Sequence, residues 1–452
     1  MLFNTPQFFL FLLVTLALFY ALPKAARKPL LLLASYFFYM SWNWRFAPLL
    51  LTLTAIDYTA ARWIEAADAI ARRKTLLVVS LAANLAFLAF FKYFNFLAAN
   101  FAALVGRPEN AFGLQIVLPL GISFHTFQSI SYVIDVYRRR QAAIRNVVDY
   151  ALFISFFPQL VAGPIVRAHE FFADLYAWHA PTGEELNRGA LLVIFGLAKK
   201  MAIADPFSLL ADRYFGNLAA HPGALPAWSG VLAFAVQIYF DFSGYTDMAI
   251  GMALLFGFHF PVNFRRPYLA AGIADFWRRW HISLSLWLRD YLYIPLGGNR
   301  KGRLRTYANL MITMLLGGLW HGANWKFMVW GGYHGTLLAA ERAVGRAIPR
   351  VITFAIVSIG WVFFRAATLR ESISIIARMF HGPRGTVLWP RWQIDLILIL
   401  LVLAMLEEKW QWFERIVSAP AWAYGAAMAV LLLGLELIGL TDVAVPFIYF
   451  QF

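Results

Sequence analysis

Long apolar runs alternate with short polar stretches along the whole chain, a pattern that predicts membrane-spanning helices. The first run, Phe8–Leu22, contains no charge and is followed by Lys24, Arg27 and Lys28. Because these basic residues follow the run and none precedes it, we expect it to be retained, with the N-terminus outside. The later candidate spans are Leu30–Thr54, Thr75–Leu97, Leu114–Val136, Val147–Val161, Gly189–Ala204, Trp228–Phe258, Tyr307–Leu319, Phe327–Ala340, Val351–Phe364, Ile394–Leu406 and Trp422–Leu440.

The run Leu30–Thr54 conflicts with the positive-inside rule if it crosses once, since the loop that follows it is also basic. The conflict disappears if Ser41–Pro48 is an aromatic turn between two short spans, because a proline and two tryptophans suit an interface better than a bilayer centre. Several other runs are shorter than the ~20 residues that a straight crossing needs. Short segments at membrane depth occur where they pack inside protein or line a wet cavity, so we expect re-entrant pieces too.

Composition supports the same class of protein. With 61% hydrophobic and 14% charged residues, the chain does not form a soluble domain with a polar surface. The net charge of +15 lies in short clusters between apolar runs, which is typical of cytoplasmic loops and not of a nucleic-acid-binding surface. The absence of cysteine excludes disulfides and thiolate metal sites. We therefore expect an all-α polytopic membrane protein, a single domain over residues 1–452, with about 10–12 transmembrane helices plus re-entrant and amphipathic helices around a central cavity or tunnel.

A polar cluster at Gly317–Trp325 interrupts the apolar pattern and is centred on His321. Apolar residues on both sides place this histidine at membrane depth. An ionisable residue there indicates a functional site, although a histidine that only hydrogen-bonds a neighbouring helix is the alternative. Both interpretations stay open on these residues alone.

The stretch Arg265–Arg305 alternates charge and aromatic character and contains no run that crosses a membrane. Read at 3.6 residues per turn, it predicts an amphipathic helix with Trp277, Trp280, Leu284 and Leu288 on one face and Arg278, Ser285 and Arg289 on another. His281 lies at the edge of the apolar face, and Pro295 with Gly297-Gly298 ends the helix in a tight turn. The helix either lies on anionic lipid or leans over the cavity and offers its arginines to an anionic substrate.

These motifs resemble those of the membrane-bound O-acyltransferase family, in its bacterial branch of alginate O-acetylation, with peptidoglycan O-acetyltransferases and teichoic acid D-alanyl transfer proteins as relatives. The resemblance covers about residues 119–335 and is looser toward both ends. The blocks that carry it are Pro119–Phe127, Gln159–Ile165, Asp241–Asp247, Phe276–Ser285, Leu288–Arg300 and Gly317–Trp325.

The resemblance implies that His321 is the catalytic base of acyl transfer and that His281 is the second family histidine. Transfer from a thioester to a hydroxyl needs the alcohol deprotonated as it attacks, and histidine suits that role. Candidate donors to the oxyanion are Trp320, Asn324 and backbone N–H groups freed by helix breaks at Gly317-Gly318 and Gly322. Supporting or substrate-binding candidates in the basic region are Arg278, Arg279, Arg289, Asp290, Asn299 and Arg300.

The C-terminal residues 447–452 fit the pattern F-x-Y-x-x-F, with Tyr449 at its centre. Aromatic residues after a last span are typical of an interface anchor. In the resembling branch this terminal tyrosine is thought to carry the acyl group as a relay, and its phenol needs a base such as His321. Lys409 and Arg415 precede the final span, so the C-terminus is expected outside.

The function implied is an inner-membrane O-acyltransferase that moves an acetyl group from cytoplasmic acetyl-CoA toward an exported polysaccharide such as alginate. A periplasmic acetyltransferase partner would complete the transfer, and neither a metal nor a nucleic acid is expected to take part. The alternatives are peptidoglycan or other glycan O-acetylation, D-alanyl transfer from an acyl-carrier protein, a non-catalytic acyl transporter, and a scaffold for a synthase. His125 and His334 are interpreted as packing residues, and Asp241 and Asp247 as partners of a neighbouring arginine or backbone group.

Overall fold

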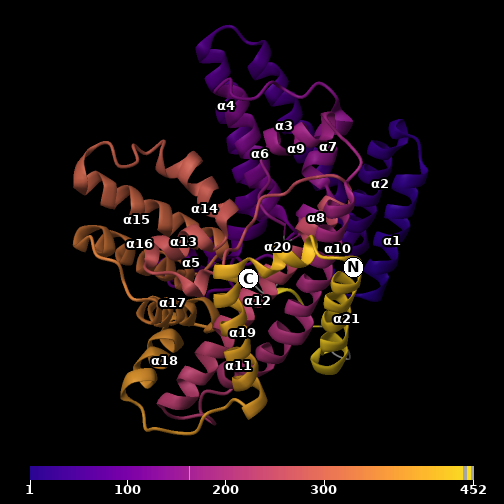
Figure 1. The fold of residues 1–452 in the computed structure, drawn as a ribbon. Coiled ribbons are helices and arrows are strands. Elements are labelled where there is room, and N and C mark those ends of the chain that lie inside the picture. Colours follow the sequence, from indigo (N-terminus) through magenta and orange to yellow (C-terminus); the bar gives the residue numbers. More distant parts are fainter. Residues whose placement is uncertain (162, 441–444, 449–452) are drawn as a thin grey trace. The chain divides into compact units, whose positions relative to one another are not determined.

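The computed structural model describes residues 1–161, 163–440 and 445–448, and within these ranges every regular element is helical. The chain divides into two compact units, residues 1–189 with 249–261, and residues 190–248 with 262–452. Figure 1 shows the order of the helices from the N-terminus to the C-terminus. α10 and α12 contribute residues to both units.

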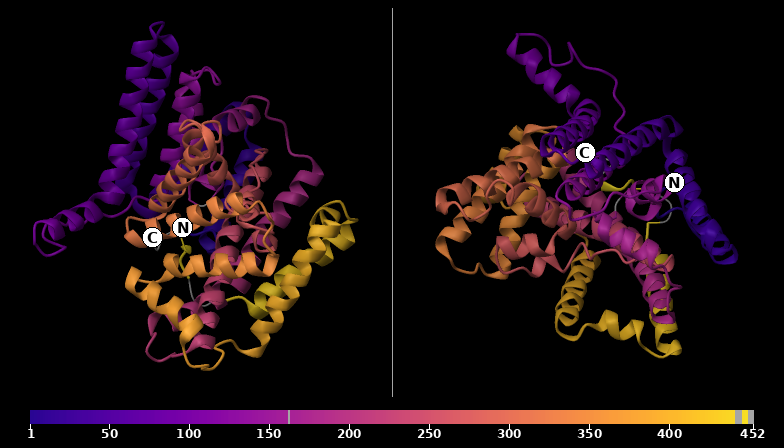
Figure 2. Two further views of the ribbon diagram at one scale, coloured as in Figure 1. Left: turned by 90° about the vertical axis from the view of Figure 1, so that its left-hand side faces the viewer. Right: turned by 90° about the horizontal axis from the view of Figure 1, so that it is seen from above.

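The first unit is built around a helical group in which α3 packs on α4 and α6 (Figure 2). The buried carboxylate of Asp57 on α3 accepts hydrogen bonds from Ser80 (2.8 Å) and Asn84 (2.7 Å) on α4, so its polar oxygen is satisfied inside the group. The elements are α1 Pro6–Ala21, α2 Lys24–Asn43, η1 Trp44–Phe46, α3 Ala47–Ala66, α4 Ile70–Leu88, η2 Ala89–Tyr93, α5 Phe94–Leu104, α6 Ile122–Tyr137, α7 Val147–Ser155, α8 Phe157–Leu160, α9 Ala168–Tyr176 and the start of α10 Gly183–Ala198.

The second unit holds the regions singled out by the sequence. Its elements are η3 Lys199–Ala204, α11 Asp205–Gly216, most of α12 Ala224–Leu255, η4 Pro267–Leu269, α13 Ile273–Arg279, α14 Ile282–Leu288, η5 Arg289–Tyr293, α15 Gly302–His321, α16 Trp325–Val344, α17 Arg350–Arg365, α18 Leu369–His381, α19 Arg391–Trp410, α20 Trp412–Val417 and α21 Ala421–Ile438. The segments η2, η3 and η5 are π-helical, a geometry frequent at functional sites.

Glycines allow α15 and α16 to pack against each other at close range. A Cβ atom added to Gly318 would lie 2.2 Å from the carbonyl oxygen of Phe327, and one added to Gly331 would lie 2.2 Å from that of Met314. The expectation that Gly317 and Gly318 interrupt the helix is wrong, because α15 continues through both. Their small size serves close helix contact, and the helix ends only at Gly322.

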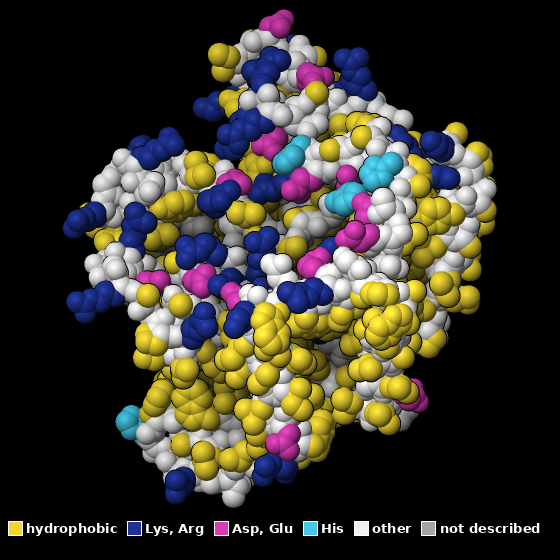
Figure 3. Space-filling model, viewed as in Figure 1, with side chains coloured by type: hydrophobic (Ala, Val, Ile, Leu, Met, Phe, Trp, Pro, Cys, Tyr) yellow, Lys and Arg dark blue, Asp and Glu magenta, His cyan; other side chains and the backbone are white. Residues whose placement is uncertain are grey.

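Apolar side chains are exposed over much of the visible surface, notably along α19 and α21 (Figure 3). Among the described residues, three helical stretches are long and apolar enough to cross a bilayer, Ile70–Leu104, Ala224–Leu255 and Ala421–Ile438, and Pro6–Ala21 is a shorter apolar helix. No residue of the last stretch is buried against protein. Such surfaces suit lipid as a solvent, so the chain is an all-helical, multi-pass membrane protein.

The turn predicted between two spans at Ser41–Pro48 is confirmed, since α2 ends at Asn43 and α3 begins at Ala47. The span predicted from Leu114 is wrong in its first part, because the helix begins only at Ile122, after Gly121 with φ +70°. The span Val147–Val161 is likewise divided, with α7 ending at Ser155. Helices α9, α11, α18 and α20 were not predicted, because they lack a long apolar run.

Candidate active site

His281 occupies a break between two short helices, whereas the sequence pattern predicted one continuous helix. α13 ends at Arg279, α14 begins at Ile282, and His281 between them has φ +42°, in the left-handed region. This conformation costs a non-glycine residue about 1–3 kcal/mol and persists only where its surroundings hold it. The side chain of His281 is completely buried. The continuous helix is therefore wrong, and the break directs the imidazole into the interior.

Asn263 holds the imidazole of His281. The amide oxygen Oδ1 lies 3.2 Å from Nδ1 of His281 and also accepts hydrogen bonds from the backbone N–H (3.1 Å) and hydroxyl (2.9 Å) of Ser283. A backbone N–H can only donate, so the atom that it meets is the oxygen and not the nitrogen of the amide. Nδ1 of neutral His281 therefore carries the proton, and the lone pair lies on Nε2.

His321 is the last residue of α15 and is buried. It lies in the wall of a cavity of about 190 Å³ within the second unit. The wall is mostly apolar, and among the described residues that line it Arg289 is the one lysine, arginine, aspartate or glutamate. The cavity is also lined by Trp277, Leu284, Ser285, Leu288, Tyr293, Leu310, Thr313, Met314, Gly317, Trp330 and Leu338. A concave apolar site with few polar groups is the usual form of a small-molecule site.

The indole of Trp320 contacts both histidines. Its ring centroid lies 6.2 Å from that of His281 and 5.0 Å from that of His321, each in an edge-to-face arrangement. Trp330 and Phe364 pack on the other faces of His321, at 5.1 and 5.3 Å. The two histidines, 40 positions apart in sequence, are thus held in one aromatic cluster.

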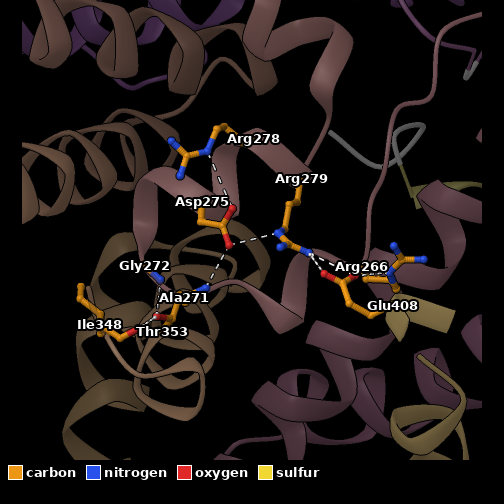
Figure 4. Close-up of polar contacts among 9 residues, drawn as sticks. All are labelled: Arg266, Ala271, Gly272, Asp275, Arg278, Arg279, Ile348, Thr353 and Glu408. Atoms are coloured by element: carbon orange, nitrogen blue, oxygen red, sulfur yellow. Dashed lines mark hydrogen bonds and ion pairs between the residues drawn. The ribbon is translucent and has the colours of Figure 1, made fainter. Parts of the chain in front are cut away.

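The two arginines of α13, Arg278 and Arg279, have different surroundings (Figure 4). Arg279 is paired with Asp275 at 3.0 Å and with Glu408 at 3.2 Å, and Glu408 also binds Arg266 at 2.6 Å. Arg278 makes only a longer ion pair with Asp275, at 3.8 Å, and 73% of its side chain is exposed. The charge of Arg279 is therefore compensated inside the protein, whereas Arg278 faces outward.

The remaining basic candidates lie around η5 and the turn after it. Arg289 and Asp290 begin η5 and form an ion pair at 2.7 Å. Asn299 and Arg300 are exposed in the turn after η5, where Gly297 and Gly298 have φ of +113° and +55°. The tight turn predicted at Pro295–Gly298 is confirmed.

Asn324 is the N-cap of α16, where its Oδ1 accepts a hydrogen bond from the backbone N–H of Lys326 at 3.0 Å. His334 is buried against Trp277 and Trp330, with ring centroids 5.2 and 4.9 Å away, as expected of a packing residue. His125 is buried on α6 in the first unit and takes no part in the aromatic cluster of the second unit.

The two aspartates of α12 pair with basic side chains, as predicted, but these are consecutive lysines of η3 and not an arginine. Asp241 lies 2.9 Å from Lys200, and Asp247 lies 2.6 Å from Lys199. Tyr449 lies outside the described residues. Among those that are described, no group of three or more His, Asp or Glu side chains is arranged to hold a metal ion.

Comparison with known proteins identifies the family. A model of the membrane-bound O-acyltransferase (MBOAT) family matches residues 75–370. The chain belongs to the membrane-bound O-acyltransferase family. The chain is 45% identical to a protein of Pseudomonas aeruginosa named probable alginate O-acetylase over 387 residues, which are 82% of this chain and 73% of that protein.

Two further relatives extend the comparison. A peptidoglycan O-acetyltransferase of Helicobacter pylori is 40% identical over 84% of this chain and 80% of its own length. A teichoic acid D-alanyltransferase of Streptococcus thermophilus is 29% identical over 50% of this chain and 57% of its own. The resemblance inferred from the motifs is confirmed, and the chain is an acyltransferase.

No motif in the sequence singles out Asn263, Lys200 or Asp205 in this acyltransferase. Asn263 lies between two apolar residues, and only the fold brings it to His281, 18 positions later. Lys200 belongs to the clusters of basic residues that were expected in cytoplasmic loops, yet it is buried between two aspartates. An unbroken apolar segment that contains a lysine and an aspartate is the one sequence signal that indicates such a pair.

Proposed function

We propose that this acyltransferase moves an acetyl group from a cytoplasmic thioester, acetyl-CoA, across the inner membrane for O-acetylation of an exported polysaccharide such as alginate. The observation that carries the proposal is His321, which lies in the wall of the cavity together with Arg289. The similarity to proteins named alginate O-acetylase, over 82% of the chain, supports acetyl as the group and alginate as the acceptor.

In the proposed reaction His321 removes the proton from a hydroxyl as its oxygen attacks the thioester carbonyl carbon. The resulting tetrahedral oxyanion expels the thiolate of coenzyme A, which receives the proton from the imidazolium, and an ester remains. General-base help of this kind contributes roughly 10²–10⁴ in rate. The Trp320 indole N–H is a candidate donor to the oxyanion, and so is the Asn324 amide, whose Oδ1 is engaged as the cap of α16.

The donor would approach from the side of η5. Phosphates are recognised by arginine through charge-assisted hydrogen bonds. Arg289, Asn299 and Arg300 supply the donors, and Asp290 orients Arg289 through their ion pair. Arg278 adds an exposed charge, whereas Arg279, paired with two carboxylates, supports the fold of this region.

The acetyl group would leave on the outer side through Tyr449. The phenol of this residue, activated by His321, accepts the group and delivers it to a periplasmic acetyltransferase partner. This route requires a tunnel through the membrane core, about 10–12 crossings, and both termini on the periplasmic side, as the basic loops indicate. The cavity at His321 supports the inner part of that route.

A second candidate acceptor is peptidoglycan. The relative named peptidoglycan O-acetyltransferase is 40% identical over 84% of the chain, which is as long a match as that to the alginate relatives. The chemistry at His321 is the same for either glycan, so the acceptor would be decided by the partner outside the membrane. D-alanyl transfer has weaker support, since that relative matches half of the chain.

The test of the base compares two buried histidines on adjacent helices. His321→Gln should reduce acetylation of the exported glycan by at least 100-fold, whereas the matched His334→Gln should retain most of it. Acetyl ester content and the amount of inserted protein are measured for both. Equal acetylation by His321→Gln and the parent protein would contradict the assignment, and equal loss in both variants would indicate packing only.

The test of the relay uses purified protein and labelled acetyl-CoA. Transfer should leave a labelled acetyl adduct on the parent protein, found by intact mass, and none on Tyr449→Phe. An adduct of equal amount on both would rule out this tyrosine as the carrier. Release of coenzyme A and labelled acetate without any adduct or acetylated product would contradict acyl transfer from this donor.

A further inference from the structure

The last described residues of the chain are held inside the second unit by a buried charge cluster. Phe447 and Ile448 are completely buried, and the backbone N–H of Ile448 donates to Oδ2 of Asp241 at 2.7 Å. Asp241 lies on α12, more than 200 positions earlier in the chain. The end of the chain is thus bound at one defined carboxylate.

Asp241 is fixed by its own ion pair. Its other oxygen, Oδ1, lies 2.9 Å from the ammonium of Lys200, and that ammonium also lies 2.6 Å from Asp205. All three side chains are almost completely buried. Two carboxylates against one ammonium leave a net negative charge, which a hydrogen bond from a backbone N–H stabilises. Removal of the tail would leave that carboxylate oxygen buried without its donor.

The segment η3 contacts the chain just after α21 and, through Asp241, again at Ile448. The backbone N–H of Leu440, just after α21, donates to the carbonyl of Met201 in η3 at 3.1 Å. Lys200, the preceding residue of η3, holds Asp241 and through it Ile448. One π-helical segment therefore supports both ends of the connection between α21 and Ile448.

Aromatic contacts continue from the tail to the site. The ring of Phe447 lies 4.3 Å from that of Tyr245 and 5.9 Å from that of Phe242, both on α12. Phe242 in turn packs edge-to-face on His281, with 4.7 Å between ring centroids. The residue two positions before Tyr449 therefore contacts the same aromatic ring as one of the two site histidines.

We propose that Asp241, held by Lys200, is the positioning residue that docks the C-terminal tail and brings Tyr449 to the two histidines. Tyr449 is bonded directly to Ile448, so an anchor on Ile448 limits where the phenol can reach. The role of Tyr449 as acyl carrier rests on the proposed function. The docking itself does not, because it concerns the described residues Phe447 and Ile448.

The chemistry of the anchor needs both oxygens of the carboxylate. One accepts from the ammonium of Lys200 and the other from the backbone of Ile448. An asparagine has one acceptor oxygen, which the charged ammonium of Lys200 attracts more strongly than the neutral N–H of Ile448 does, so the N–H₂ group turns toward Ile448. Asp241→Asn keeps the volume and leaves Lys200 paired with Asp205, so the fold is retained while the tail loses its acceptor.

The experiment uses the absence of cysteine from the chain. Ile448→Cys keeps the backbone N–H and places a single thiol in the docked tail. Its reaction with N-ethylmaleimide is followed in the purified full-length protein. The parent thiol should react slowly, and Asp241→Asn should raise the rate by about 10-fold or more, as expected for the loss of a hydrogen bond to a charged acceptor.

Two matched controls separate docking from general loosening. Asp205→Asn removes the same charge from the same cluster without a contact to Ile448, and Asp247→Asn does so in the neighbouring pair with Lys199. Both should leave the labelling rate within about twofold of the parent, because neither residue holds the tail. An unchanged rate in Asp241→Asn, or an equal rise in either control, would overturn the docking.

The yield of the acetyl adduct, measured on the same variants, then tests whether the docked tail positions Tyr449 as the carrier. Asp241→Asn should lower the yield of the acetyl adduct in proportion to the fraction of undocked tail. If labelling rises but no adduct forms even in the parent protein, the docking stands and the relay is wrong. If the adduct forms equally in Asp241→Asn and the parent although the tail is released, Asp241 does not position the carrier, and that part of the inference is overturned.

Discussion

Oδ1 of Asn263 accepts a hydrogen bond from Nδ1 of His281 at 3.2 Å, and this contact fixes which nitrogen of a completely buried imidazole carries the proton. The acceptor comes from the segment after α12, and the histidine lies at the break between α13 and α14. Because the oxygen also accepts from Ser283, rotation of the amide is costly. The orientation of the second histidine is thus set by a residue outside every motif that identified the family.

Replacing Asn263 tests that orientation. Asn263→Ala should lower the turnover number about 10- to 100-fold with little change in KM, because the histidine loses its fixed tautomer while the cavity wall is unchanged. Ser283→Ala removes a hydrogen bond to the same oxygen without touching the imidazole, so it should cost less than about threefold. Steady-state kinetics on both variants is the measurement, and an equal loss in the two would indicate packing alone.

The charge in the cavity wall is tested at Arg289. Arg289→Ala should raise the KM for an anionic thioester about tenfold and leave the turnover number within about twofold, as expected for the loss of one hydrogen bond to a charged group. Arg391→Ala is the control, since its side chain is 87% exposed and does not line the cavity. The KM of the arginine-containing protein should also rise with ionic strength. A KM unaffected by Arg289→Ala would remove this residue from donor binding.

The close packing of α15 on α16 predicts unequal effects at neighbouring glycines. Gly331→Ala adds a Cβ atom 2.2 Å from the carbonyl oxygen of Met314, so the helices must separate, at a cost of about 1–3 kcal/mol. Gly332→Ala meets only the end of the Leu315 side chain at 3.5 Å and should be tolerated. Thermal unfolding in detergent measures the difference. Equal melting temperatures would mean that the pair is looser than described.

A histidine outside the candidate spans predicts a pH dependence of stability. His259 lies 2.8 Å from Glu185 and 3.2 Å from Asp174 in the first unit. Burial opposes its charge, but the two carboxylates outweigh that effect and raise the pKa of His259 above 6.5. A backbone hydrogen bond from Thr182 and the contact with His259 lower the pKa of Glu185 to about 2.

The pH dependence of stability follows from the directions of the two pKa shifts, at His259 and at Glu185. Stability from protonated His259 is complete below pH about 6.5 and is lost as pH rises through the raised pKa, whereas that from ionised Glu185 is complete above pH about 4.5 and is lost toward pH 2. As the pH rises above about 6.5, the melting temperature of the parent protein should therefore fall more steeply than that of His259→Gln. Parallel curves for the two proteins would exclude this cluster as the cause.

Much of the fold could be predicted from apolar runs, because a helix in lipid must satisfy its backbone within itself and so needs an unbroken apolar segment. The turn between α2 and α3 followed from charge and from Pro48. Short amphipathic helices such as α18 were not predicted, since they are apolar on one side only and so contain no unbroken apolar run. The span predicted to begin at Leu114 shows that an apolar run is not always helical, because the apolar residues before Gly121 do not form a helix.

For the site, sequence motifs identified His281 and His321 but not what holds them. The break at His281 was invisible, because the residues around it fit a helical period and no glycine or proline marks the change of direction. Asn263 could not be found either, since His281 is 18 positions away and is brought near only by the fold, and the pairing of Lys200 with Asp241, 41 positions away, was hidden for the same reason. The residue types in the sequence indicate which chemistry is available, and the tertiary contacts determine which of those residues can take part in it.

The break at His281 also has a mechanical consequence. Asp275 and Arg279, which belong to the ion network with Glu408, lie on α13, while Ser285 and Leu288 of the cavity wall lie on α14. The two helices are joined only by Trp280 and His281. A disturbance at the ion-paired surface therefore reaches the part of the cavity wall on α14 along the chain through a single joint, and the imidazole is part of that joint.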